Sequence, residues 1–135
     1  MDCYDKATRS RVMRRVRATD TAPELYVRKA LFKAGFRYRL HQAKLPGKPD
    51  IVLSKYRIVI FVNGCFWHRH IGCKHATTPA FNKDYWERKF RRNVERDKEA
   101  VKQLENAGWT VWTAWECEIA EATSKFVTSL REMKH

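Results

Sequence analysis

The sequence lacks long apolar runs, internal repeats and low-complexity tracts. None of its apolar stretches approaches the roughly 20 residues needed to span a bilayer. Its first residues, Met1 to Asp5, lack the apolar core of a signal peptide. A cytoplasmic location is therefore expected, where thiols stay reduced. At 135 residues the chain is expected to form one domain, 1–135, which can bury a core without disulfides.

Acidic residues are scarce relative to basic ones. Lys plus Arg number 28 against 15 Asp plus Glu, which gives a formal net charge of +13. Because this excess comes with abundant aromatic residues rather than in a charged tail, it favours DNA or RNA as the partner over a basic surface that binds nothing. The opening segment, 1–20, is interpreted as a DNA-contacting helix or as a solvated amphipathic one. Its candidate DNA-binding residues are Lys6, Arg9, Arg14 and Arg15.

Only four cysteines are present, and three of them can share one site. In a reducing compartment, cysteines close to a histidine are interpreted as metal ligands in preference to disulfide partners. The spacing Cys65-x4-His70-x2-Cys73 gives three candidate ligands, and Cys117 can supply the fourth. A site of three cysteines and one histidine is closed and tetrahedral, which is typical of structural zinc. The alternative is that these are ordinary buried thiols, and Cys3 is expected to be free.

The order of elements predicts an α/β fold with a mixed central sheet. Thr21-Ala22-Pro23-Glu24 fits a capping box with proline in the first turn, and Gly35 is a plausible end for the helix that follows. The apolar, β-branched run 58–62 suits a central strand, although periodicity alone does not exclude a buried helix. The expected helices are 6–17, 21–35, 83–107 and 116–133, and the expected strands are 36–40, 50–53, 56–62 and 109–115.

The long helix 83–107 carries one carboxylate inside its apolar stripe. At about 100° per residue, Asp97 falls on the same face as Trp86, Phe90 and Leu104. A buried carboxylate there either pairs with an arginine or orients a histidine.

Pro49-Asp50 opens a strand after a turn, as acidic residues do in many metal-dependent nucleases. Mg²⁺ takes carboxylate and backbone oxygens, keeps several waters and stabilises charge at a reacting phosphate. Alone, such a dipeptide is usually only a turn. If His70 binds zinc, His68 is left over as a candidate general base that activates water, with Asp97 accepting its other ring proton. For Glu24, the alternative to a role in the site is the capping box itself.

Phe66 and Trp67 lie in a glycine-flanked, ligand-rich loop, which is a poor place for core anchors. Wedging such side chains into a duplex unstacks it at a cost of a few kcal/mol, and the cost is lower at a mismatch. Trp86 is the third candidate for this role. Core packing is the ordinary alternative for all three.

Five segments together form a highly specific pattern that extends over nearly the whole chain: Asp5–Ser10, Leu45–Asp50, Asn63–His68, Asn93–Asp97 and Trp115–Cys117. With them the chain resembles the very-short-patch repair (Vsr) DNA mismatch endonucleases. The resemblance implies a restriction-endonuclease-like fold and Mg²⁺-dependent nicking of double-stranded DNA on the 5′ side of the thymine in a T·G mismatch. Such mismatches arise when 5-methylcytosine deaminates. It also implies a monomeric bacterial enzyme at the nucleoid, with mismatch-repair proteins as candidate partners.

The resemblance also implies roles for individual residues. Asp50 would hold Mg²⁺ together with the backbone carbonyl of Val62, and His68 would be the general base, supported by Glu24 and Asp97. The DNA-intercalating residues would be Phe66, Trp67 and Trp86, and the structural zinc ligands would be Cys65, His70, Cys73 and Cys117. Lys48 and Arg69 would join the DNA-binding residues of the opening segment.

The chain departs from the family pattern at several positions. The best-known member has histidine where this chain has Asn63, which cannot act as acid or base and is left with a positioning role at most. Val62 replaces a threonine, which is harmless if only the carbonyl is used. One extra residue lies between His70 and Cys73. The usual nuclease E-x-K positions are 61–63 here and contain no lysine, which favours water activation by histidine.

Two other functions fit part of the same pattern. A restriction-type nuclease would use the same metal site on matched DNA without the aromatic wedge. A non-catalytic, zinc-stabilised DNA-binding module would keep the basic charge and the cysteine cluster, but it would leave Asp50, His68 and Asp97 unexplained.

Overall fold

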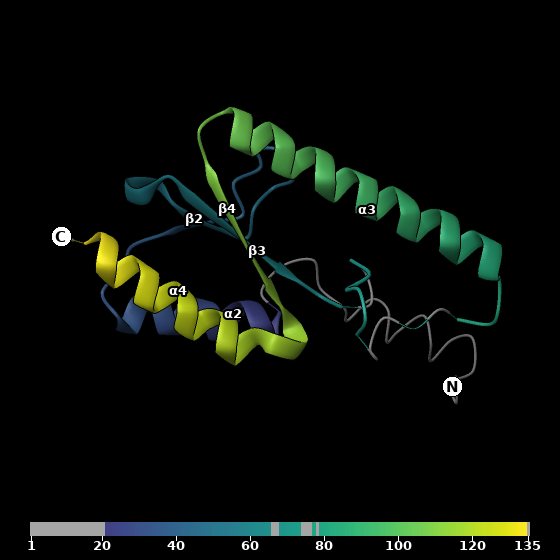
Figure 1. Cartoon of the computed structure of the whole chain (residues 1–135), viewed down its shortest axis with the longest axis horizontal. Helices are drawn as coiled ribbons and strands as arrows, with labels where there is room; N and C mark the ends of the chain where they lie inside the picture. Colours follow the sequence, from purple (N-terminus) through teal and green to yellow (C-terminus); the bar gives the residue numbers. More distant parts are fainter. Residues whose placement is uncertain (1–20, 66–67, 74–76, 78, 135) are drawn as a thin grey trace.

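The computed structural model describes residues 21–65, 68–73, 77 and 79–134, and within them helices flank a four-stranded sheet (Figure 1). The helices are α2 (Ala22–Lys33), α3 (Lys83–Asn106) and α4 (Ile119–Met133), with 3-10 turns η1 (Ser54–Tyr56) and η2 (Glu116–Glu118). The strands are β1 (Arg39–Leu40), β2 (Ile51–Leu53), β3 (Ile58–Asn63) and β4 (Thr110–Trp115). The helix expected at 6–17 lies outside the described residues.

The sheet is mixed, as the order of elements predicted. Its strand order is β1-β2-β3-β4, in which β1, β2 and β3 pair antiparallel and β4 pairs parallel to β3. A parallel pair needs a long crossover, and α3 supplies it. In Figure 1, α3 lies on one face of the sheet, and α2 and α4 lie on the other.

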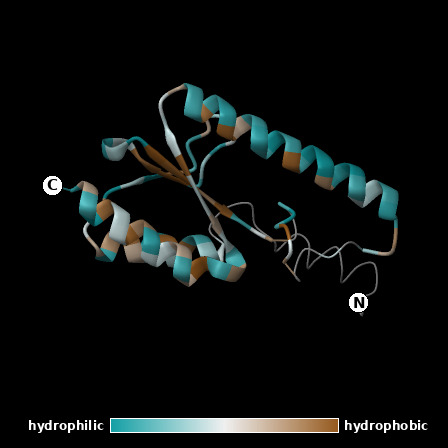
Figure 2. Cartoon of the chain, viewed as in Figure 1, coloured by the Kyte–Doolittle hydropathy of each residue, from teal (hydrophilic) through white to brown (hydrophobic). Residues whose placement is uncertain are grey.

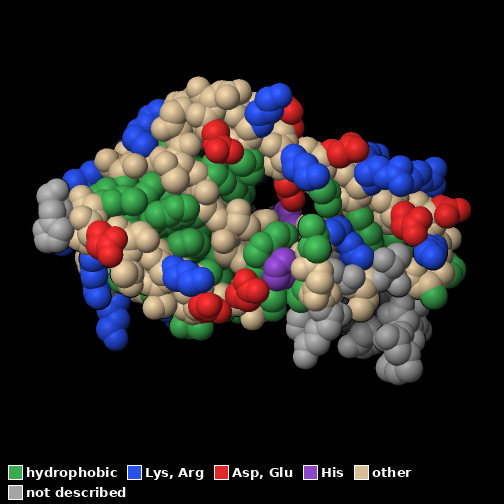
Figure 3. Space-filling view, viewed as in Figure 1, with side chains coloured by type: hydrophobic (Ala, Val, Ile, Leu, Met, Phe, Trp, Pro, Cys, Tyr) green, Lys and Arg blue, Asp and Glu red, His purple; other side chains and the backbone are tan. Residues whose placement is uncertain are grey.

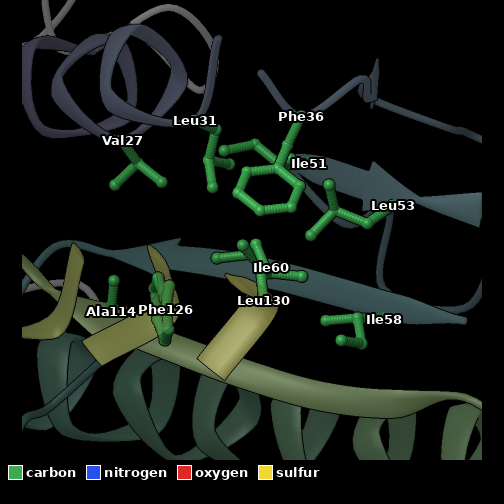
Figure 4. Close-up of a cluster of buried hydrophobic side chains, with 10 residues drawn as sticks. All are labelled: Val27, Leu31, Phe36, Ile51, Leu53, Ile58, Ile60, Ala114, Phe126 and Leu130. Carbon is green, nitrogen blue, oxygen red and sulfur yellow. The ribbon is translucent and has the colours of Figure 1, made fainter. Parts of the chain in front are cut away.

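The core has two parts because β3 is buried on both faces. Ile58 and Ile60 point toward α2 and α4, and Val59 points toward Leu104 of α3. Figure 4 shows the larger cluster, which consists of Val27, Leu31, Phe36, Ile51, Leu53, Ile58, Ile60, Ala114, Phe126 and Leu130. The central strands β2 and β3 are largely hydrophobic, whereas α3 is hydrophilic over most of its surface (Figure 2). This two-sided burial explains the unbroken apolar run at 58–62.

The first strand is shorter than expected. Residues 36–38 close the end of α2 instead of pairing in the sheet: the Phe36 N–H donates to the Leu31 carbonyl at 3.0 Å, and the Tyr38 hydroxyl donates to the Arg28 carbonyl at 3.2 Å. Only Arg39–Leu40 pairs with β2. The prediction of strand from residue 36 was therefore wrong, because the Phe36 backbone bonds to the helix end while its ring packs in the core, and Tyr38 bonds back to α2.

The strand expected at 56–62 begins two residues later and ends one residue later. The chain turns at η1, and Arg57 adopts the left-handed conformation with φ 57°, so β3 begins at Ile58 and continues to Asn63. The ends of α2 match their signals: Thr21 Oγ1 accepts from the Glu24 N–H at 3.4 Å, and Gly35 follows the helix with φ 90°. None of the helices in the described ranges combines the length and apolarity that crossing a membrane requires.

Gly47 lets the turn before Asp50 pass close to α3 and β3. Its φ is 73°, and a Cβ added to it would lie 2.6 Å from the Cβ of Ala100 and 3.1 Å from the ring of Phe61. A side chain there would push the turn away from the sheet. The position of Asp50, three residues on, depends on this close approach.

Gly47→Ala should therefore add both backbone strain and a steric clash, and it should destabilise the protein more than a Gly→Ala change that adds backbone strain alone. Gly35→Ala is the matched control, since Gly35 has φ 90° and nothing within 4 Å of an added Cβ. We expect Gly35→Ala to lower the free energy of unfolding by about 1 kcal/mol. Overpacking should cost Gly47→Ala about 1–3 kcal/mol more. Urea unfolding measures both, and equal losses would show that the turn is not tightly packed.

Candidate functional site

Three ligand-bearing side chains meet at the adjoining ends of β1 and β2. His41 follows β1, Asp50 precedes β2, and Glu24 lies in the first turn of α2. The backbone N–H of His41 donates to the backbone carbonyl of Asp50 at 3.1 Å, which extends the β1–β2 pairing by one residue pair. The side-chain ligand atoms of the three residues all lie within 4.8 Å of one another. The fold thus builds a carboxylate–imidazole–carboxylate cluster that can hold a metal ion.

The Glu24 carboxylate belongs to this cluster. Its side chain is only 2% exposed, and each of its oxygens lies 3.0 Å from Nε2 of His41. Nη1 of Arg28, one turn along α2, lies 3.3 Å from Oε2. The capping box accounts for the backbone N–H of Glu24, but its carboxylate faces the site.

Asp50 connects the cluster to the end of β3. The Val62 N–H donates to Asp50 Oδ2 at 2.7 Å. Burial raises the pKa of Asp50 to about 6, and the nearby charge of Glu24 adds to the rise, whereas the bond from Val62 and the charge of His41 oppose it. Above that pH the Asp50 carboxylate is ionised next to Glu24 in a poorly solvated place. A cation would relieve this repulsion.

The raised pKa makes a stability prediction. The folded protein holds the Asp50 proton more tightly than the unfolded chain does, so ionisation costs stability at pH values above about 6, and the cost disappears as the pH falls toward 3.8. Asp50→Asn removes the charge while its amide oxygen can still accept from Val62. We expect the free energy of unfolding in EDTA at pH 7.5 to rise by about 1–3 kcal/mol, with a smaller gain at pH 5.

Asp84→Asn is the control for that experiment. Asp84 is an exposed carboxylate in the first turn of α3, where a negative charge is favourable, so its loss should be neutral or slightly destabilising. A metal-free Asp50→Asn protein less stable than the wild type at pH 7.5 would contradict the electrostatic account of the site.

A second pair lies beyond the end of β3. Nδ1 of His68 is 2.6 Å from Oδ2 of Asp97, which projects from α3. A carboxylate only accepts, so in the neutral imidazole Nδ1 carries the proton and Nε2 is left with a free lone pair. The two side chains are 32% and 40% exposed, so water and a large substrate can reach them. The expected contact between His68 and Asp97 is confirmed.

A second group of potential metal ligands lies in and around the loop that carries His68. The ligand atoms of Cys65, His70, Cys73 and Cys117 lie within 4.8 Å of one another. Nδ1 of His70 is 3.6 Å from Sγ of Cys65 and 3.4 Å from Sγ of Cys117. Tetrahedral zinc with ordinary bond lengths would separate nitrogen and sulfur by about 3.6 Å, so the side chains fit a tetrahedral metal ion.

The cluster ties the loop after β3 to the turn after β4. Cys65 is fully buried, and its N–H donates to Oε1 of Glu116 in η2 at 3.0 Å. The His70 ring stacks on Trp115, with 4.3 Å between centroids and an interplanar angle of 8°. Because β3 and β4 are parallel neighbours with Asn63 opposite Trp115, both halves of the cluster arrive at the same edge of the sheet.

Other predicted site residues lie around this edge. Asn63 ends β3 next to Val62, and Lys48 is exposed on the turn before Asp50 with φ 52°. Arg69 faces inward: its guanidinium lies 4.0 Å from the ring centroid of Phe90, and Nη1 donates to the Thr77 carbonyl at 2.9 Å. Arg69 therefore links the loop to α3. The sequence predicted only a DNA contact for this residue and not this structural one.

Trp86 is half-buried on α3, and its ring lies between those of Tyr85 and Phe90, at centroid distances of 5.4 and 5.7 Å. Lys and Arg side chains gather over α3, and histidine side chains show at the centre of the same face (Figure 3). A hollow on this helix is lined by Tyr85, Arg88, Arg91 and Arg92. The remaining predicted residues, Lys6, Arg9, Arg14, Arg15, Phe66 and Trp67, lie outside the described residues.

Sequence reasoning missed His41. The signal was available, because two strands joined by a turn pair antiparallel, so the residue after the first strand lies beside the residue before the second. That rule places His41 beside Asp50. The predicted strand 36–40 ended at the right residue, but the histidine that follows belongs to no familiar motif.

The sequence matches known proteins over most of its length. Residues 1–75 match the family model described as DNA mismatch endonuclease Vsr. The type II nicking enzyme V.NmeAIP of Neisseria meningitidis serogroup A is 45% identical over 118 residues, which cover 87% of this chain and 84% of the relative. The DNA mismatch endonuclease Vsr of Escherichia coli K12 is 43% identical over 118 residues, covering 87% and 75%. The type II nicking enzyme V.NaeI of Lentzea aerocolonigenes is 42% identical, covering 96% and 80%.

Proposed function

Because the chain belongs to the Vsr family of DNA mismatch endonucleases, we propose that it nicks one strand of duplex DNA on the 5′ side of the thymine in a T·G mismatch. Mismatch-specific nicking is the activity of this family. The observation that carries the proposal is the placement of a buried carboxylate cluster and a histidine–aspartate pair at one end of β3. Val62 bonds to Asp50, and His68 follows six residues later on the same segment.

The carboxylate cluster fits a hard divalent cation. Asp50 and Glu24 bring a half-buried and a buried carboxylate together, and we propose that Asp50 and the backbone carbonyl of Val62 hold Mg²⁺. When bound, this ion neutralises negative charge on the scissile phosphate and on the leaving oxygen. Asn63, beside Val62, has an amide that can position a phosphate or a water. The mixed sheet with these residues at adjoining strand ends supports a restriction-endonuclease-like architecture.

His68 is proposed to be the general base. Its Nδ1 proton is held by Asp97, so Nε2 is free to take a proton from the attacking water. The imidazolium that forms is then stabilised by the Asp97 carboxylate at 2.6 Å. A lysine is not needed for this step, which agrees with its absence at 61–63.

The DNA is proposed to be held by the basic residues of the opening segment and of α3, with Lys48 beside the cut site. Trp86 lies in the aromatic row on α3, and Phe66 and Trp67 lie in sequence between Cys65 and His68, both of which are fixed by other contacts. These three aromatic residues are proposed to enter the stack beside the mismatch. We propose a monomer that acts on nucleoid DNA in the bacterial cytoplasm, with mismatch-repair proteins as further partners.

The cluster of Cys65, His70, Cys73 and Cys117 is proposed to hold structural zinc. The four ligands close the tetrahedron, so no position is left for a substrate. The ion would join the loop after β3 to η2 and thereby fix the starting point of the segment that carries His68.

Metal analysis of the purified protein should find about one tightly held zinc per chain. Cys117→Ser should lose the zinc together with several degrees of thermal stability, because one ligand of the tetrahedron is gone. Cys3→Ser is the control, since Cys3 is expected to be a free thiol, and it should keep both. A folded wild-type protein without zinc would contradict the assignment.

The catalytic roles are tested by cutting and binding measured on the same linear duplex with one T·G pair. Asp50→Ala should reduce Mg²⁺-dependent nicking to background, and His68→Ala should reduce it by about 10²–10⁴-fold, with gel-shift affinity for the duplex largely kept. The Glu132→Ala variant, an exposed carboxylate near the end of α4, should cut normally.

A matched T·A duplex serves as the substrate control in that assay. Rapid cutting of the matched duplex by the wild type would favour a restriction-type activity. If Asp50→Ala or His68→Ala cuts the mismatched duplex at the wild-type rate, the role given to that residue is wrong.

A further inference from the structure

His41 lies in the carboxylate cluster without a role in the proposed chemistry. We propose that Nε2 of His41 is a direct ligand of the divalent ion at Asp50, which makes the site a mixed nitrogen–oxygen one. This inference rests on the proposed metal site at Asp50 and adds to it the residue that decides which ions the site prefers. The family pattern of motif residues does not include position 41.

The spacing of the atoms carries the argument. Nε2 of His41 lies 3.0 Å from each oxygen of Glu24, and all ligand atoms of Glu24, His41 and Asp50 lie within 4.8 Å of one another. In an octahedron with metal–ligand distances of about 2.1 Å, neighbouring ligands are about 3.0 Å apart and opposite ones about 4.2 Å. The His41–Glu24 distance therefore equals that of neighbouring ligands around one ion, and Asp50 lies close enough to complete the set. Nε2, which bonds to Glu24 in this structure, is the atom that would turn to the metal.

The backbone directs the imidazole to this place. His41 adopts the left-handed conformation with φ 46°, which is unfavourable for a residue with a side chain. Its N–H is bonded to the Asp50 carbonyl at 3.1 Å, and the side chain of the next residue, Gln42, donates to the Leu40 carbonyl at 3.0 Å. The segment on both sides of His41 is thus tied down, and the ring projects toward the two carboxylates.

The charges are consistent with a metal held by these groups. Glu24 and Asp50 bring two negative charges, which a divalent cation balances, and a neutral imidazole adds a ligand without adding charge. Imidazole nitrogen favours first-row transition ions over Mg²⁺, which prefers oxygen. We therefore expect the site to select Mn²⁺ over Mg²⁺ more strongly than a site of carboxylates alone would.

The main alternative is that His41 only holds the Glu24 carboxylate through a hydrogen bond. His41→Gln separates the two roles, because the glutamine amide can still donate to Glu24 but offers no imidazole nitrogen. A positioning role would be largely kept by this variant, whereas a ligand role would be lost.

The experiment is pulsed electron paramagnetic resonance of Mn²⁺ bound to the zinc-replete full chain without DNA. We expect coupling of the electron spin to an imidazole nitrogen in the wild type, its loss in His41→Gln, and its persistence in the control His68→Gln. Titration should show that His41→Gln weakens Mn²⁺ binding by about tenfold or more relative to its effect on Mg²⁺ binding. Asp50→Asn should weaken the binding of both ions.

Three results would overturn the inference: bound Mn²⁺ without nitrogen coupling in the wild type, coupling that persists in His41→Gln, or equal effects of that variant on both ions. Nicking of T·G duplex by the wild type with Mg²⁺ is measured separately. A wild type that nicks but shows no nitrogen coupling overturns the role of His41 alone, whereas a wild type that binds Mn²⁺ through nitrogen but never nicks overturns the proposed function alone.

Discussion

The placement of two poorly solvated carboxylates side by side is the constraint on which the site depends. Glu24 and Asp50 lie on different elements, and burial together with the charge of Glu24 raises the pKa of Asp50 to about 6. The fold offsets this repulsion with three donors: the Val62 amide, the His41 ring and the Arg28 guanidinium. Because the pKa of Asp50 is raised, its ionisation costs stability, and strongly shifted pKa values are common at functional sites.

Strand β3 brings the separate parts of the site into register. Its interior residues are buried on both faces, which fixes the strand, and its last residues lie at the candidate site. Val62 contacts Asp50, Asn63 lies opposite Trp115 of β4, and the segment that follows leads to Cys65 and His68. Because β4 runs parallel to β3, Cys117 reaches the cysteine cluster at the same edge. One strand therefore relates Asp50, the His68–Asp97 pair and the cysteine cluster to one another.

Much of this arrangement could be predicted from the sequence, because the signals were local. The β-branched run predicted β3, the helical period placed Asp97 where it meets His68, and the spacing of cysteines predicted the cluster. What failed depended on tertiary contacts. Phe36 and Tyr38 are residue types typical of strands, but they bond to α2 instead. The Glu24 carboxylate contacts the ring of His41, 17 residues away. The roles of Phe66, Trp67 and the basic opening segment remain predictions.

The central claim is that the carboxylate cluster and the His68–Asp97 pair act together on one phosphate beside a mismatched thymine. The most direct test maps the cut on a duplex with a single T·G pair, in which the two strands carry different end labels, under single-turnover conditions with Mg²⁺. The account predicts one product, from the thymine strand alone, broken on the 5′ side of the thymine, and none in EDTA. Cutting of both strands, of the guanine strand, or at positions unrelated to the mismatch would contradict it.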